Sequence, residues 1–187
     1  MWLMPTNNAF GAWPRSGEID MVEIRSNDDI NCHGKQKGNT LMGATVHFGL
    51  NATTDKWRKT HYEALVGLSL TFYNPLLSPI ILFKKMSLLI WIFFFFFFFF
   101  VDCDSVLSEG SFADDFHVYG LQRLHDSIRL YVDGIPIGQV SPPQEGFWEL
   151  GGFDDQLTNI WANGTNMTPF DHPVNCFFSP FIEIYSS

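Results

Sequence analysis

The chain has 187 residues, an aromatic share of 17% and a formal net charge of -9, which is enough length for one domain with a sizeable core. The negative charge argues against nucleic acid and anionic membrane surfaces as partners, because both are bound through clustered Lys and Arg. The three cysteines match no metal-ligand spacing, and Cys32 beside His33 lacks the second pair that a zinc site needs. We therefore expect a neutral or sugar-like ligand, no metal and no cofactor.

The first part of the chain, from residue 1 to about 62, consists of short apolar or alternating runs. Turn formers such as "PTNN", "SNDD" and "HGKQKGN" separate these runs. Alternation with a period of two residues, broken by Gly, Pro, Asn and Asp, is typical of strands joined by loops. The pattern predicts an all-β domain.

Three carboxylates lie close together in this part, at Glu18, Asp20 and Glu23. Strand side chains alternate between faces, so the first two share a face and the third should point away. A β-bulge between Asp20 and Glu23 would add one residue and bring all three acids to one cleft. Two carboxylates about 5 Å apart are what a retaining glycosidase needs, and their mutual repulsion separates their pKa values. A bare spacing of this kind also fits a solvated strand edge.

The middle of the chain, 65–105, loses the alternating pattern. Its apolar run from Met86 to Val101 is slightly shorter than the roughly 20 residues of a membrane-spanning helix, and two lysines flank it. Only TTT and TTC encode phenylalanine, so Phe93–Phe100 also fits the pyrimidine tract that precedes a splice acceptor. Two hypotheses follow for this insert, a translated intron and a membrane span.

The alternating style returns after the insert. "FHVYGLQRLHDSIRLYVDGIPIGQV" contains two strand-like runs, followed by Asp133 and Gly134 as a tight hairpin signal before a third run. We expect an antiparallel hairpin at this point, and no segment has a convincing helical period.

Longer stretches resemble one known family. "WLMPTNNAFGAWPRSGEIDMVE" resembles the active-site strand of glycoside hydrolase family 16, in its branch of laminarinases and invertebrate β-1,3-glucan-binding proteins, and "GATVHFGLNATTDKWRKTHYEA" and "FWELGGFDDQLTNIWANGTNMTPFDHP" extend the resemblance. It divides the chain into a first part of the hydrolase domain (1–64), a non-homologous apolar insert (65–105), a continuation (106–173) and a non-homologous tail (174–187). The codons of Val174 and Asn175 begin with GT and AA, which resembles a splice donor read through into the tail. Together with the absence of the family's upstream strands, this predicts a gene fragment.

The resemblance implies a fold and a set of site residues. The fold would be an antiparallel β-sandwich, a jelly roll of the concanavalin A-like type, left incomplete by missing strands and interrupted by the insert. Its implied catalytic residues are Glu18 as nucleophile, Asp20 as its assistant and Glu23 as general acid and base. Substrate contacts are implied for Trp13, Arg15 and His47.

The function that the resemblance implies is endo-acting, retaining hydrolysis of β-1,3-glucan polysaccharide or oligosaccharide. The alternative is a non-catalytic β-1,3-glucan-binding protein of innate immunity. One departure bears on this choice, since Gln122, Arg123 and Leu124 stand where the family usually has Glu, Trp and Thr. An intact family member would be secreted, although "MWLMPTNNAF" is no signal peptide; a membrane location would require the run 86–101 to span a bilayer.

Overall fold

The structure is a computed structural model, and it describes residues 1–26, 30–32, 35–66 and 110–178. Of the apolar insert 65–105, only residues 65 and 66 are described; the rest of the insert lies outside the described residues, as do 106–109 and 179–187. The intron and membrane hypotheses therefore lie outside them too. Among the described residues, no helix has the length and apolar character needed to cross a membrane.

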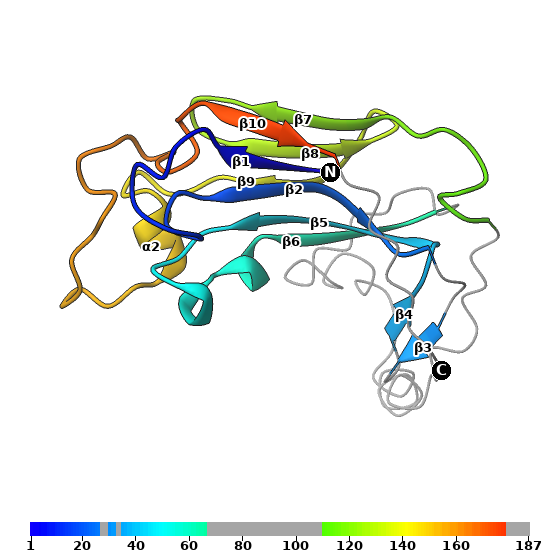
Figure 1. Ribbon diagram of the computed structural model, residues 1–187, viewed down its shortest axis with the longest axis horizontal. Coiled ribbons are helices and arrows are strands. Elements are labelled where there is room, and N and C mark those ends of the chain that lie inside the picture. Colours follow the sequence, from blue (N-terminus) through cyan, green and yellow to red (C-terminus); the bar gives the residue numbers. More distant parts are fainter. Residues whose placement is uncertain (27–29, 33–34, 67–109, 179–187) are drawn as a thin grey trace, which may run out of the picture.

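Strands dominate the described part of the chain, and they form two larger antiparallel sheets (Figure 1). The first sheet has five strands in the order β10-β1-β2-β5-β6. Their bounds are Trp2–Pro5 (β1), Glu18–Ile24 (β2), Leu41–His47 (β5), His61–Leu65 (β6) and Val174–Phe177 (β10). The second sheet has the order β7-β8-β9, with Tyr119–Arg123 (β7), Ile128–Val132 (β8) and Ile135–Val140 (β9).

Shorter elements complete the described fold. A separate hairpin pairs Ile30–Cys32 (β3) with Lys35–Lys37 (β4). Two 3-10 turns, Ala52–Thr54 (η1) and Trp57–Lys59 (η2), connect β5 to β6, and one short helix covers Phe147–Gly151 (α2). The predicted turn is present, because β8 and β9 are joined by Asp133 and Gly134 with φ angles of 50° and 77°.

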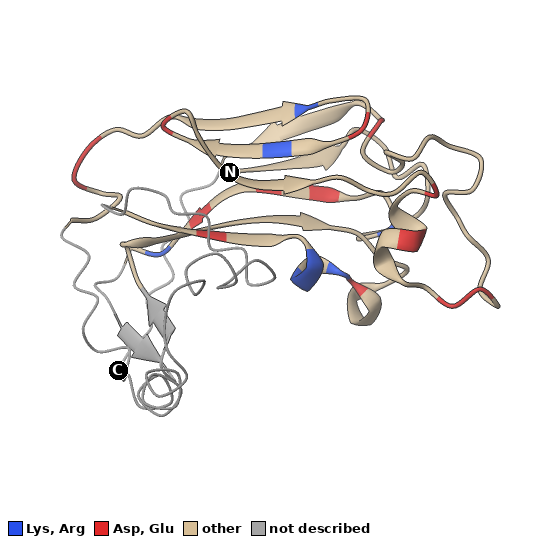
Figure 2. Ribbon diagram, turned by 180° about the vertical axis from the view of Figure 1, so that it is seen from behind, with Lys and Arg blue, Asp and Glu red and all other residues tan. Residues whose placement is uncertain are grey.

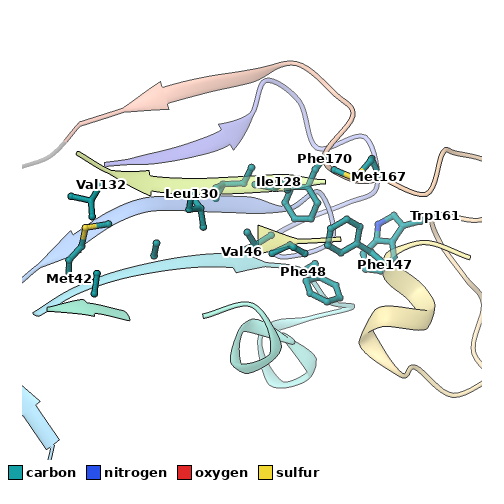
Figure 3. Packing of buried hydrophobic residues seen from close by; sticks show 14 of the residues in the cluster. Met42, Val46, Phe48, Ile128, Leu130, Val132, Phe147, Trp161, Met167 and Phe170 are labelled. Carbon is teal, nitrogen blue, oxygen red and sulfur yellow. The ribbon is translucent and has the colours of Figure 1, made fainter. Parts of the chain in front are cut away.

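The core lies between the two larger sheets (Figure 3). On β5, Met42, Ala44 and Val46 are each 0% exposed, because every second residue of this strand faces inward. The facing strand β8 presents Ile128 and Leu130, also 0% exposed. Full burial of such a side chain contributes about 1.5–3 kcal/mol. The predicted all-β antiparallel sandwich of the jelly-roll type is confirmed.

Aromatic side chains close one end of this core, beside α2 (Figure 3). The ring of Phe48, at the end of β5, meets Phe147 edge to face at a centroid distance of 4.9 Å. Trp148 and Trp161 are buried in the same cluster, 6.1 Å apart. The Trp161 indole N–H also donates to the backbone carbonyl of Arg15 at 2.8 Å. The cluster therefore anchors the loop that leads into β2.

The edge strand β10 comes from the start of the expected tail. Val174 to Phe177 pair antiparallel with β1, in register with Pro5 to Trp2. The Trp2 ring stacks on that of Phe177, with the ring centroids 5.9 Å apart, so it belongs to the framework of the sheet. The boundaries 1–64, 65–105, 106–173 and 174–187 stay predictions about homology.

Candidate active site

The three acids of β2 lie on the polar face of the five-stranded sheet. In the pairing with β5, Glu18 is opposite His47, Asp20 opposite Thr45, and Glu23 opposite Gly43. Between the last two pairs β2 advances three residues and β5 only two, so the extra residue is in β2. The predicted β-bulge is confirmed.

The two faces of β2 differ, since one is apolar and the other is acidic. Ile19 and Val46, which pair with each other between the acid positions, point into the core and are at most 1% exposed. The opposite face carries the acids, and Figure 2 shows the acidic positions of β2 within the middle of the sheet. This face holds charge because it is not covered by the second sheet.

Glu18 is half-buried beside Trp13. The Trp13 indole N–H donates to the Glu18 Oε2 at 2.5 Å, while the Trp13 side chain as a whole stays 40% exposed. Burial and the neighbouring Asp20 charge raise the pKa of Glu18, whereas the Trp13 N–H and the charge of His47 oppose this rise. Glu18 is thus a carboxylate with one fixed donor and a titration range above that of a free glutamate.

His47 connects two aspartates. Its Nε2 is 2.9 Å from Asp20 Oδ2, and its Nδ1 is 2.6 Å from Asp55 Oδ2. Burial lowers the pKa of His47, but the hydrogen bonds to Asp20 and Asp55 outweigh this effect and raise the pKa to about 9. An imidazolium therefore lies beside Glu18 at neutral pH. Both of its ring nitrogens contact carboxylates, so only the face of the ring can contact a ligand. The centroid of this ring is 5.7 Å from that of the Trp13 ring.

Glu23 lies in a different environment at the other end of the row. It is exposed, and its Oε2 accepts a hydrogen bond from the Thr45 hydroxyl at 3.2 Å. The same hydroxyl oxygen is 2.8 Å from the Nδ1 of His61, whose Nε2 is 3.4 Å from Glu63 Oε1. A chain of polar contacts thus runs from Glu23 across β5 to β6.

Arg15 lies on the loop before β2. Its Nε donates to the carbonyl of Leu50 at 2.8 Å, which ties this loop to the turn after β5. Gly17 ends the loop with a φ of +79°, and an added Cβ would be only 2.6 Å from the Phe170 ring. A glycine is required there because both the backbone conformation and the space exclude a side chain.

The structure brings together Trp13, Glu18, Asp20 and His47 through direct contacts. Glu23 shares their face at the other side of the bulge. The sequence pattern did not indicate four further polar side chains of the site: Thr45, Asp55, His61 and Glu63. Asp55 directly follows η1, whose first turn is capped by the Asn51 side chain. This position at the end of a capped turn is the local feature that could have indicated it.

Arg123, which stands where the family usually has tryptophan, belongs to the second sheet. Its Nη1 donates to the carbonyls of Phe170 and His172, at 3.1 and 2.7 Å. It therefore holds the segment 170–172 in place, and that segment packs beneath the loop of Gly17 through the Phe170 ring.

The only described group of three or more potential metal ligands within reach of one ion is Glu18, Asp20 and His47, whose donor atoms lie within 4.8 Å of one another. Asp20 and His47 already form an ion pair, so the positive charge of the imidazolium occupies the place that a cation would take. This donor set favours a protonated histidine over a bound metal.

Comparisons with known proteins connect the chain to glucan-recognising relatives, although no family model matches it. It is similar to the β-1,3-glucan-binding protein of Penaeus monodon, with 32% identity over 171 residues that cover 91% of this chain and 34% of that protein. It is also similar to a glucan endo-1,3-beta-glucosidase of Cryptopygus antarcticus, with 44% identity over 48 residues, which are 26% of this chain and 14% of that protein.

A solved structure of a glycoside hydrolase family 16 endo-glucanase from Bacteroides ovatus has a TM-score of 0.42 and 16% identity, over 75% of this chain and 39% of that one. The chain spans about a third or less of the length of the curated relatives named above. Its similarity to the Penaeus monodon protein nevertheless extends over nearly all of its own length. The resemblance to β-1,3-glucan-binding proteins and laminarinase-type glucanases that the sequence motifs indicate is therefore confirmed.

Proposed function

We propose that the acid row of β2 hydrolyses β-1,3-glucan within the chain, with retention at the anomeric carbon. The observation that carries this proposal is the β-bulge, because it puts Glu23 on the same face as Glu18 and Asp20. A strand kept only for solubility would need neither the bulge nor the fixed donor on Glu18. The two glutamates also have different surroundings, as the two steps of a double displacement require.

In the first step Glu18 is the nucleophile. One of its carboxylate oxygens forms a bond to the anomeric carbon while the bond from this carbon to the glycosidic oxygen breaks, and Glu23 transfers its proton to the departing oxygen. Asp20 contacts the Nε2 of His47 and so holds its ring, and the positive charge of His47 favours the ionised form of Glu18.

In the second step water completes the reaction. Glu23, now ionised, takes a proton from a water molecule as the water oxygen bonds to the anomeric carbon, and the ester bond to Glu18 breaks. Two inversions at the same carbon leave the product with the configuration of the substrate. Both carboxyl groups return to their initial protonation states, so the cycle needs no further reactant.

Three other side chains are proposed to contact substrate. The half-exposed Trp13 ring offers a face on which a sugar ring can stack, next to Glu18. Arg15 keeps its terminal guanidinium nitrogens for sugar hydroxyls while its Nε holds the Leu50 carbonyl. His47 offers its ring face beside Trp13.

The second candidate function is recognition of β-1,3-glucan without cleavage, in innate immunity. What favours it is the similarity to the β-1,3-glucan-binding protein of Penaeus monodon. Either function fits an extracellular protein, and that is the location we propose. A membrane location would depend on the run 86–101, which lies outside the described residues.

Incubation of the full chain with laminarin tests the proposal. We expect new reducing ends with wild type and none with Glu18→Gln, and the first product seen by proton NMR should carry the β configuration. Laminarin that is retained by the protein in a pull-down but releases no reducing ends would support the binding function instead. An α product would contradict the retaining mechanism.

A further inference from the structure

We infer that Thr45 and His61 are positioning residues for Glu23, and that the Glu23 oxygen they leave free, Oε1, carries the proton in catalysis. This inference rests on the proposed function, because it names the residues that position Glu23, the proposed acid and base. The contacts that carry it cross three neighbouring strands, from Glu23 on β2 through Thr45 on β5 to His61 on β6.

Thr45 is the fixed point of this chain of contacts. Its side chain is 2% exposed although the acid it contacts is exposed, so its hydroxyl is held by the sheet and not by solvent. The backbone of Thr45 pairs with Asp20 on one side and with His61 on the other. A single buried hydroxyl therefore joins the strand of the acids to the edge of the described sheet.

The hydrogen count of the threonine hydroxyl sets the direction of the chain. Thr45 Oγ1 has one hydrogen, and an ionised Glu23 can only accept it. The Thr45 oxygen must then accept from His61 Nδ1–H, at 2.8 Å. This requires a proton on Nδ1 of His61; a hydrogen bond from Nε2 to Glu63 Oε1, 3.4 Å away, requires a second proton on Nε2. The chain is thus a one-way series of donors that ends on Glu23 Oε2.

Gly43 supplies the space for this arrangement. It pairs with Glu23 on one side and Glu63 on the other. A Cβ at Gly43 would be 3.2 Å from His61 Cε1 and 3.8 Å from Glu23 Oε2. The missing side chain therefore allows the imidazole and the carboxylate to approach Thr45 from opposite sides.

The consequence for catalysis concerns both oxygens of Glu23. A donor fixed on Oε2 stabilises the carboxylate that remains after proton transfer. It also limits rotation of the carboxyl group and presents Oε1 to the glycosidic oxygen. Removal of the Thr45 hydroxyl should therefore affect proton transfer and leave attack by Glu18 unchanged.

Substrates with different leaving groups test this directly. Laminaribiosides with a methoxyphenyl group need a proton on departure, whereas those with a 2,4-dinitrophenyl group do not. For Thr45→Val we expect the rate of glycosylation to fall about tenfold with the first and to change little with the second. The basic limb of kcat/KM should also move to higher pH. Thr45→Ser, which keeps the hydroxyl, should restore both properties.

Thr60→Val is the matched control, because Thr60 is 1% exposed and its hydroxyl donates only to the backbone carbonyls of Val46 and Trp57. A variant that merely loosens the sheet should lower both rates equally and leave the pH limb in place. If Thr45→Val behaves like this control, the inference is overturned.

A second measurement keeps the inference separate from the proposed function. In NMR spectra recorded at one fixed pH, Glu23→Gln should move the Nδ1 signal of His61, and this change should vanish when Thr45 is also changed to Val. A wild-type protein that releases no reducing ends from laminarin contradicts the proposed function while this coupling is still measurable. Identical His61 Nδ1 signals in wild type and Glu23→Gln contradict the inference whatever the activity is.

Discussion

The two ends of the acid row differ in how their carboxylates are surrounded. At one end Glu18 is half-buried, takes an indole N–H from Trp13 and lies beside the charged pair of Asp20 and His47. At the other end Glu23 is exposed and takes one neutral hydroxyl bond from Thr45. A nucleophile must stay ionised and fixed, whereas an acid and base must exchange protons with water. The fixed donor at one end and the exposure at the other match these two tasks, and the Trp13 N–H and the charge of His47 counter the rise in the pKa of Glu18 that burial causes.

The largest expected effect comes from removal of either glutamate. Glu18→Gln should lower kcat on laminarin by about 10⁴-fold or more, and Glu23→Gln by about 10²–10⁴-fold, because each removes one half of the double displacement. The two ends are then told apart with azide, a nucleophile that needs no base. With a dinitrophenyl glycoside, azide should rescue Glu23→Ala as a β-azide and Glu18→Ala as an α-azide. The reverse pattern would exchange the two roles.

A smaller effect should follow at the nucleophile end from Trp13→Phe. This change keeps an aromatic face for the sugar and removes only the N–H that donates to Glu18. A hydrogen bond to a charged group is worth about 1.5–3 kcal/mol, so kcat/KM should fall roughly ten- to a hundredfold. Without this donor the pKa of Glu18 should rise further, and the acidic limb of the pH profile should move to higher pH. An unchanged acidic limb would show that the N–H does not act on Glu18.

Stability should depend on pH through His47, which faces Asp20, Asp55 and Glu18. Its pKa rises from 6.5 to about 9 on folding, so the folded state binds the extra proton. The resulting stabilisation is fully present below about pH 6.5 and is lost as the pH rises through about 9. Urea unfolding of wild type and His47→Gln should give free energies that differ most at pH 6 and converge near pH 10. A constant difference would mean that the histidine is neutral.

The smallest effect is expected at the other end, from Gly43→Ala. The added methyl group comes within 3.2 Å of His61 Cε1, so the imidazole must shift by a few tenths of an ångström. We expect kcat on laminarin to fall a few-fold, while the pKa of His47 measured by NMR stays at its wild-type value. A change in the His47 titration would show that the two ends are not independent.

Local sequence patterns predicted one end of the site better than the other. The spacing of Glu18, Asp20 and Glu23 within one strand was enough to require a bulge, and the pairing with β5 has it. Trp13 could be placed near the acids because it lies on the loop that leads into their strand. The alternating apolar residues and the Asp133–Gly134 turn likewise predicted the sandwich and its hairpin.

Sequence patterns could not predict which residues of neighbouring strands lie opposite each other. Thr45 meets Glu23 and His61 only because β5 lies between β2 and β6, and nothing local to these residues encodes that order. Asp55 reaches His47 through the turn that follows β5, over a separation of eight residues. Arg123, which stands where the family usually has tryptophan, donates to the backbone carbonyls of Phe170 and His172, 47 and 49 residues away, and no local pattern predicts these contacts.

The most direct test of the central claim is to locate the covalent intermediate. The full chain would be incubated with a 2-deoxy-2-fluoro laminaribioside that carries a dinitrophenyl group, since the fluorine slows release of the glycosyl-enzyme. Intact-mass measurement and peptide mapping should then find one sugar ester, on Glu18. A labelled Glu23, or a protein that binds laminarin but acquires no ester, would contradict the account.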